Sequence, residues 1–232
     1  MSTADRISTA SMLLLSFGTG VLDAATYLGL HGVFTANMTG NVVFVGLGLA
    51  GGNDVPLLRA GLALGGFVLG AVVIGLVQRD REIRHNTDAV AAGTFVLAAL
   101  LVAGSALALH AVHLSTLGLD LLTATIAFAM GAQAVAARRV GVPDVSTVVV
   151  TSTIAGLAAD GPWTGNRTGW LATHRRLAAV LSMGAGAVAG AFLLRLTIAV
   201  PVALSAAILA LVGAVSVWRA ARARTREPVP VG

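Results

Sequence analysis

The chain has 232 residues, of which 56% are hydrophobic and 11% charged, and its mean hydropathy is +0.88. Soluble domains carry roughly 25% charged residues, so a water-soluble fold of this length would lack the polar surface to cover its core. The sequence contains no cysteine, which excludes disulfides and thiolate metal sites. The formal charge of +5 comes from arginines between apolar runs, so we expect no nucleic-acid binding.

Six apolar segments are long enough to cross a bilayer, which takes about 20 residues per helix. The first, Ala10 to Leu30, is too long for the apolar region of a signal peptide, and we expect an uncleaved spanning helix. The others are Leu57 to Val77, Ala89 to Leu109, Leu117 to Ala137, Leu177 to Leu194 and Leu196 to Trp218. The predicted fold class is an all-α, polytopic transmembrane helix bundle, forming a single membrane domain over residues 1–232.

Two further apolar runs, Val33 to Ala50 and Val145 to Ala159, are shorter or interrupted by polar residues. If both spanned, the arginines from Arg79 to Arg84 would lie outside, against the tendency of arginines to stay on the cytoplasmic side. We therefore favour six spanning helices plus two short broken or re-entrant helices. This places both termini, and a basic tail at residues 219–232, in the cytoplasm.

The order of elements repeats, which predicts an inverted internal repeat with halves at residues 10–109 and 114–218. Each half has a helix with an intramembrane polar residue, then a short threonine-containing run, then a helix with two glycines four residues apart. The polar residues are Asp23 and Gln133, and the glycines are Gly66 with Gly70 and Gly186 with Gly190. Such glycine pairs favour close helix packing. Inverted repeats around broken helices are typical of secondary transporters.

The first predicted span contains an ionisable residue, Asp23. A carboxylate inside a bilayer costs about 2.5–3.5 kcal/mol on insertion scales, and by default it marks a functional site. Asp23 is therefore a candidate proton- or cation-binding group. The alternative is a structural carboxylate that accepts hydrogen bonds from threonine or asparagine of a neighbouring helix.

The two short runs supply the other candidate solute ligands. Thr39, Gly40 and Asn41 open an apolar stretch, where glycine permits irregular backbone and the polar side chains offer capping groups. A half-helix that starts there presents free amide groups to a polar or anionic ligand. The parallel residues of the second run are Thr151, Ser152 and Thr153. Gln133 is either a solute-orienting group or an interhelical hydrogen-bonding residue.

No catalytic or nucleotide-binding motif is visible, so we do not expect an enzyme. His110 and His113 stand three apart, but no third ligand lies near them in the sequence, so we expect no metal site. No cofactor is expected.

Several stretches resemble the YoaK family of bacterial multi-pass membrane proteins, whose function is unassigned. The first-half stretches are GVLDA from Gly20, GVF from Gly32 and NMTGNV from Asn37. The second-half stretch is FAMGAQ from Phe128, with Pro143, Thr147 and Thr151. Ala134 and Ser152 depart from the family pattern, which often has asparagine and glycine there. The resemblance implies a helical protein of the bacterial cytoplasmic membrane and supplies no substrate.

The leading hypothesis is a transporter or channel-like permease for a small polar or anionic solute, proton-coupled through Asp23. The alternative is a non-transporting membrane scaffold or regulatory subunit, whose polar residues serve helix packing. The expected partners are the lipid bilayer and an unidentified solute, and homo-oligomer formation stays open.

Overall fold

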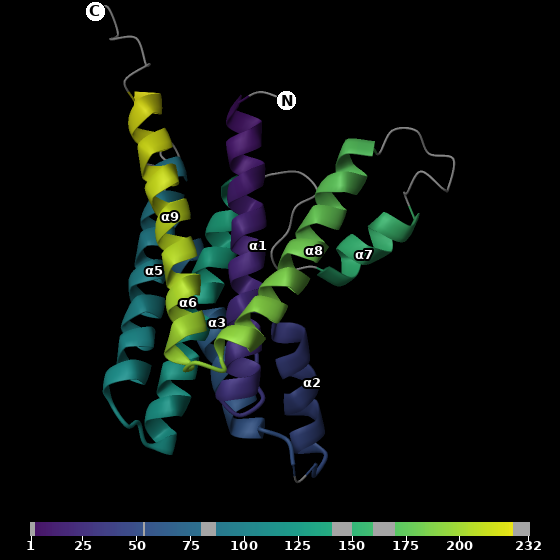
Figure 1. The fold of residues 1–232 in the computed structure, drawn as a ribbon, viewed down its shortest axis with the longest axis vertical. Helices are drawn as coiled ribbons and strands as arrows, with labels where there is room; N and C mark the ends of the chain where they lie inside the picture. The colour runs from purple at the N-terminus through teal and green to yellow at the C-terminus, as the bar shows by residue number, and fades with distance from the viewer. Residues whose placement is uncertain (1–2, 53, 80–86, 141–149, 160–169, 225–232) are drawn as a thin grey trace, which may run out of the picture.

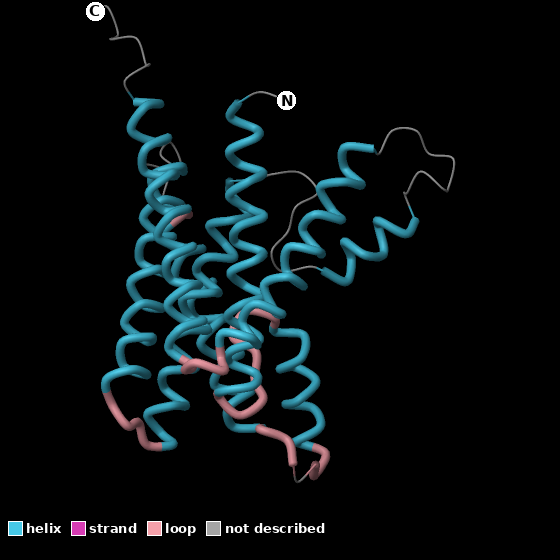
Figure 2. Tube along the Cα trace, viewed as in Figure 1, coloured by secondary structure: helices cyan, strands magenta, loops and turns pink. Residues whose placement is uncertain are grey.

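The computed structural model describes residues 3–52, 54–79, 87–140, 150–159 and 170–224. Within these ranges the chain forms eight helices, coloured along the chain in Figure 1, and the connections that the structure describes are loops and turns (Figure 2). The helices are α1 (Thr3–Gly29), α2 (Met38–Leu49), α3 (Leu57–Val77), α5 (Thr87–Ala111), α6 (Thr116–Val140), α7 (Val150–Ala159), α8 (Trp170–Leu193) and α9 (Ala199–Arg224).

Six of these helices, namely α1, α3, α5, α6, α8 and α9, are long and apolar enough to cross a bilayer. The predicted fold class, a polytopic helical bundle with six spanning and two shorter helices, is therefore confirmed. The start of α1 and the end of α9 lie at the same end of the bundle (Figure 1), as an even number of crossings requires.

Helix α2 does not cross the bundle. Its 12 residues extend about 18 Å at 1.5 Å per residue, against about 30 Å for the hydrocarbon core of a bilayer. It begins part-way along the bundle and ends near the start of α3, at the end opposite to the termini (Figure 1). The chain thus turns back into the bundle after α1 and leaves again on the same side.

The reversal after α1 is made by two residues in the left-handed backbone region. His31 has φ 66° and Gly32 has φ 82°. The amide of Gly32 donates to the Tyr27 carbonyl at 2.9 Å, which satisfies one of the last carbonyls of the helix. Glycine accepts this backbone without cost, whereas His31 adopts it at a small steric cost.

Helices α1 and α8 run in the same direction and, where they cross (Figure 1), pack so closely that their glycines face backbone. A Cβ atom at Gly20 of α1 would overlap with the Met183 carbonyl of α8, and one at Gly186 of α8 would overlap with the Phe17 carbonyl of α1. The Ser182 hydroxyl of α8 donates to a carbonyl of α1 at 2.8 Å. Small residues therefore set the short separation between these two helices.

Helices α3 and α6 form a second close pair with the same kind of contact. A Cβ atom at Gly131 of α6 would overlap with the Phe67 carbonyl of α3, and one at Gly70 of α3 would overlap with the Phe128 carbonyl of α6. Gly66, one turn before Gly70, faces backbone of α6 as well. Gly131 of α6 therefore faces a backbone carbonyl of α3 in the same way that Gly20 of α1 faces one of α8.

The remaining two spanning helices, α5 and α9, pack against each other along their lengths. Each also packs against one member of a close pair, α5 against α6 and α9 against α1. Buried apolar side chains of α1, α5, α6 and α9 form the core, with Phe95 of α5 fully buried among them.

Several helix boundaries differ from the sequence-based expectation, among them the start of α8 and the end of α9. Helix α9 continues past Trp218 to Arg224, because alanine and arginine favour helix and the Arg222 guanidinium stacks on the Trp218 ring at 4.0 Å. The first residues of the predicted tail are therefore helical. Helix α8 begins at Trp170, earlier than the predicted span from Leu177. Of the second short run, residues 145–149 lie outside the described part of the chain.

Candidate functional site

The Asp23 carboxylate of α1 is buried and accepts hydrogen bonds from the loop that precedes α2. Its Oδ1 atom accepts from the backbone amides of Thr35 at 2.9 Å and Ala36 at 2.8 Å. Its Oδ2 atom accepts from the backbone amide of Asn37 at 3.1 Å and from the Asn37 side chain at 2.5 Å. The Thr35 hydroxyl adds a longer contact of 3.5 Å to Oδ1. Both carboxylate oxygens are therefore engaged by residues 35–37.

The physical reason is the unpaired backbone at the start of a helix. The first amides of α2 and those of the loop before it have no helical acceptor, and hydrocarbon offers no water to replace one. Asn37 occupies the N-cap position of α2 but makes no capping bond with its side chain, which donates to Asp23 instead. Asp23, which lies on a different helix, thus satisfies the backbone amides of the three residues that lead into α2.

Asn41 completes the capping of this loop. Its side-chain Oδ1 accepts from the Phe34 amide at 3.1 Å, and its Nδ2 donates to the Phe34 carbonyl at 2.6 Å. The side chain is fully buried, although the rest of α2 is mostly exposed. Together with the Asp23 contacts, this gives every backbone amide from residue 34 to residue 37 a side-chain acceptor.

Aromatic stacking holds the same loop against α1 and α2. The Phe34 ring stacks on Tyr27 of α1 at 4.8 Å and lies 6.3 Å from the Phe44 ring of α2. Gly40 lies directly against Phe34, where a Cβ atom would come within 2.7 Å of the ring. Glycine at this position of α2 therefore makes room for the stacked ring.

A small cavity lies in the core between α1, α6 and α9. The Thr19 hydroxyl of α1 and the Gln133 Nε2 atom of α6 are buried and have no hydrogen-bond partner among the described residues. Both residues line this cavity, whose volume is about 10 Å³ and which also borders Ser205 of α9. The volume corresponds to about one water molecule. The other lining residues are Leu15, Gly18, Leu22, Met130, Ile208 and Leu209.

The predicted solute ligands therefore do not form a single cluster. Asp23 and Asn41 meet around the loop before α2, whereas Gln133 lies in the cavity with residues of α1 and α9. Thr39 and Thr151 are exposed, and Thr153 is buried on α7, which packs against α8. The side chain of Ser152 lies outside the described part of the structure.

Sequence reasoning missed Thr19, Ser205 and an ion pair between α3 and α6. The Arg59 Nε atom donates to Asp120 Oδ1, and the side chains are 18% and 8% exposed. Asp120 lies inside the predicted span Leu117 to Ala137, so the cost of an intramembrane carboxylate could have drawn attention to it. Thr19 gave a weaker signal, a polar residue between two glycines in the first span.

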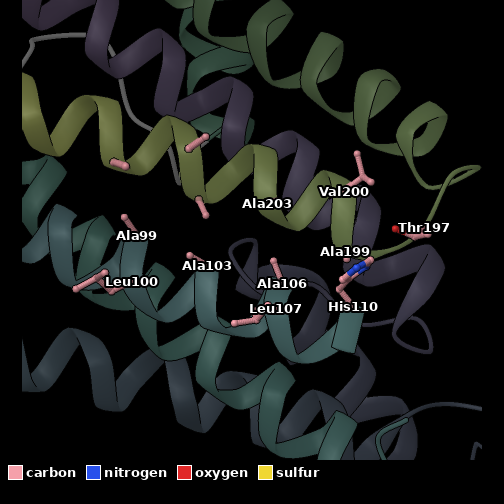
Figure 3. Close-up of a pocket in the computed structure, with 13 residues that line it drawn as sticks. Ala99, Leu100, Ala103, Ala106, Leu107, His110, Thr197, Ala199, Val200 and Ala203 are labelled. Carbon is pink, nitrogen blue, oxygen red and sulfur yellow. The ribbon is translucent and has the colours of Figure 1, made fainter. Parts of the chain in front are cut away.

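A larger groove of about 730 Å³ lies between α5 and α9, open to the outside of the bundle. Alanine side chains of both helices form most of its wall, and His110 and Thr197 lie together at one end (Figure 3). Because the rest of the lining is apolar, the groove offers few partners to a polar solute. In a bilayer it faces acyl chains.

Comparison with known proteins places the chain in a family. Residues 11–215 match the family described as "Protein of unknown function (DUF1275)". The chain is also 30% identical over 158 residues to the UPF0700 transmembrane protein YoaK of Bacillus subtilis (strain 168), which covers 68% of this chain and 69% of that protein. No solved structure matches the chain significantly. This chain is a multi-pass membrane protein that belongs to the DUF1275 family and is similar to YoaK.

Proposed function

We propose that this protein is a permease for a small polar solute, with its solute site at the cavity between α1, α6 and α9. One observation carries the proposal. Thr19 and Gln133 line the same cavity, and each has a buried polar atom without a hydrogen-bond partner among the described residues. An unpaired polar group in an apolar interior costs free energy, and a bound solute would recover that cost by hydrogen bonding to both atoms.

The cavity is small, and in this proposal its size indicates which conformation of the transport cycle the structure represents. About 10 Å³ holds roughly one water molecule, so a larger solute enters only when α1 moves relative to α6 or α9. The structure then corresponds to a closed conformation, and transport requires a second arrangement of the same helices. Alternation between two such arrangements is the usual mechanism of secondary transporters.

We also propose that residues 10–109 and 114–218 form an inverted repeat. The matching contacts of Gly20 with α8 and Gly131 with α3 support this, as does the placement of α5 and α9 against each other. The cavity then lies where the halves meet, with α1 from the first half and α6 and α9 from the second. Substrate sites of inverted-repeat transporters lie at such interfaces.

In this proposal Asp23 and Asn41 position α2 and do not bind the solute directly. The oxygens of Asp23 already accept from residues 35–37, so a proton or cation would have to displace those donors first. The sequence-based roles of Thr39 and Thr151 as direct ligands receive no support from their exposed positions. We also propose that the bundle lies in the bacterial cytoplasmic membrane with both termini inside, an orientation that the distribution of arginines supports.

A second candidate function is a non-transporting scaffold or regulatory subunit without enzymatic activity. The saturation of Asp23 and Asn41 by loop backbone favours it, because these residues then have a complete structural explanation. This candidate leaves the unpartnered atoms of Thr19 and Gln133 without a role. We therefore place it second.

An osmotic swelling assay distinguishes the two candidates. Liposomes that contain the full-length protein are shrunk with a series of small polar and small anionic solutes, and re-swelling reports solute entry. The permease predicts faster re-swelling than in protein-free liposomes for at least one solute. Equal rates for every solute would contradict the permease and support the scaffold.

A further inference from the structure

The Arg59–Asp120 ion pair has a fixed place relative to the glycine contacts of its helices. Arg59 lies eleven residues before Gly70 in α3, and Asp120 lies eleven residues before Gly131 in α6. Eleven residues are about three helical turns, so both side chains point toward the same interface as the glycines. There the Asp120 carboxylate neutralises the arginine.

The other close pair has the arginine at the equivalent position but not the carboxylate. Arg175 lies eleven residues before Gly186 in α8, and Thr9 lies eleven residues before Gly20 in α1. The Arg175 Nε atom and the Thr9 hydroxyl are both buried, and neither has a hydrogen-bond partner among the described residues. The charged Arg175 and the Thr9 hydroxyl therefore each offer a buried donor atom that has no acceptor among the described residues.

A second arginine approaches the same turn of α1. The Arg219 side chain of α9 donates to the Ser8 hydroxyl at 2.6 Å, and Ser8 directly precedes Thr9. The described acidic residue of the first turn of α1, Asp5, is exposed. Arg219 thus adds a second positive charge, from α9, to the turn of α1 that follows Asp5.

The depth of this site in the bilayer follows from the spanning segments. The apolar part of α8 begins at Thr173, two residues before Arg175, and that of α1 begins at Asp5. Arg175 and Thr9 therefore lie near the boundary between hydrocarbon and lipid headgroups. Basic pockets between helices at this depth bind anionic headgroups, and the planar guanidinium suits the oxygens of a phosphate.

We propose that Arg175 and Thr9 bind the phosphate of an anionic phospholipid headgroup between α1 and α8, close to Arg219. The phosphate takes the place of the carboxylate that Asp120 supplies in the equivalent pair. Arg175 donates to the phosphate oxygens, the Thr9 hydroxyl donates a further hydrogen bond, and the acyl chains lie along the exposed face of α8. This site is separate from the core cavity and does not depend on permease activity.

Thermal unfolding of the full-length protein in detergent tests the lipid preference. The midpoint is measured during titration with phosphatidylglycerol, with phosphatidylcholine, and with inorganic phosphate in phosphatidylcholine. We expect saturable stabilisation by phosphatidylglycerol and at most a small effect of the other two. Equal stabilisation by phosphatidylcholine would overturn the anionic site, and equal stabilisation by inorganic phosphate would overturn the assignment to a lipid.

Two substitutions locate the site. Arg175→Gln removes the charge and should raise the apparent dissociation constant for phosphatidylglycerol at least about tenfold. Thr9→Asp places a carboxylate beside Arg175, which should weaken lipid binding to a similar extent and raise the unfolding midpoint without lipid. Arg222→Gln is the control, since it removes an equal charge from the exposed end of α9. Unchanged lipid affinity in both site variants would refute the assignment.

Discussion

The Oδ2 atom of Asp23 accepts two hydrogen bonds from Asn37, one from the backbone amide and one from the side-chain amide. Asp23 lies on α1 and Asn37 is the N-cap residue of α2, so the contact joins a spanning helix to a short one. It explains how irregular backbone is kept inside a bilayer, where each amide needs an acceptor within the protein.

The Asp23 carboxylate should therefore dominate the stability of the α1–α2 connection. Asp23→Ala removes the acceptor of five donated hydrogen bonds. Interhelical hydrogen bonds in membranes average about 0.6 kcal/mol each, so we expect a loss of about 3 kcal/mol in the free energy of unfolding. Asp23→Asn keeps one acceptor oxygen and should lose about half as much. Chemical unfolding in detergent micelles measures both changes.

The exposed Asp54 in the loop before α3 provides the control. Asp54→Asn removes the same charge from a surface position and should change the free energy of unfolding by less than about 0.5 kcal/mol. An Asp23→Ala protein as stable as this control would show that the carboxylate does not hold the loop.

Asn41 should contribute to the stability of the protein through the Phe34 backbone. Its side chain accepts a hydrogen bond from the Phe34 amide and donates one to the Phe34 carbonyl. Asn41→Ala leaves the partly buried amide and carbonyl of Phe34 unpaired, at an expected cost of about 1–3 kcal/mol. Thr39→Ala, two residues earlier on an exposed face of α2, should be nearly neutral. Thermal unfolding of the two variants side by side checks this, and equal midpoints would argue against the Phe34 contact.

The glycine contacts predict which glycines tolerate a methyl group. Gly20→Ala and Gly131→Ala would force α1 from α8 and α6 from α3, at an expected cost of about 1–3 kcal/mol each. At Gly75 and Gly104 nothing lies within 4 Å of an added Cβ atom, and alanine there should be neutral or stabilise the helix by up to about 1 kcal/mol. Unfolding free energies in detergent separate the two classes, and a uniform effect at all four would contradict the packing.

The Arg59–Asp120 pair should behave as a coupled unit. Arg59→Ala or Asp120→Ala leaves the partner charge unpaired in a partly buried position, at an expected cost of about 1–3 kcal/mol. The double variant should be more stable than the sum of the single effects predicts, because it leaves no orphan charge. A double-mutant cycle measures this coupling, and strictly additive losses would show that the ion pair contributes no interaction energy.

Length and hydrophobicity alone were sufficient to predict the spanning helices. A bilayer requires about 20 apolar residues per helix, so the segments from Leu57 to Val77 and from Leu117 to Ala137 were evident. The run from Val33 to Ala50 is broken by polar residues and a glycine, which indicated a short helix. Its start at Met38 depends on Asp23, a tertiary contact that no local pattern encodes.

The candidate site was predictable only in part for the same reason. A polar side chain inside a bilayer costs free energy, and this cost singled out Asp23 and Gln133 as residues that need an explanation. The sequence could not reveal that the donors of Asp23 come from the loop at residues 35–37, or that Gln133 and Thr19 line the same cavity. Both facts depend on how α1 packs against its neighbours.

The most direct test of the proposed permease is solute entry in the Gln133→Leu variant, measured by re-swelling of proteoliposomes with a solute that enters through the wild type. Leucine fills the cavity without hydrogen-bonding groups, so we expect the protein-dependent rate to fall at least about tenfold. Gln78→Leu is the control, since Gln78 is also buried with an unpartnered Oε1 atom but lies at the end of α3. A Gln133→Leu rate equal to that of the wild type would contradict the proposal that the solute passes between Thr19 and Gln133.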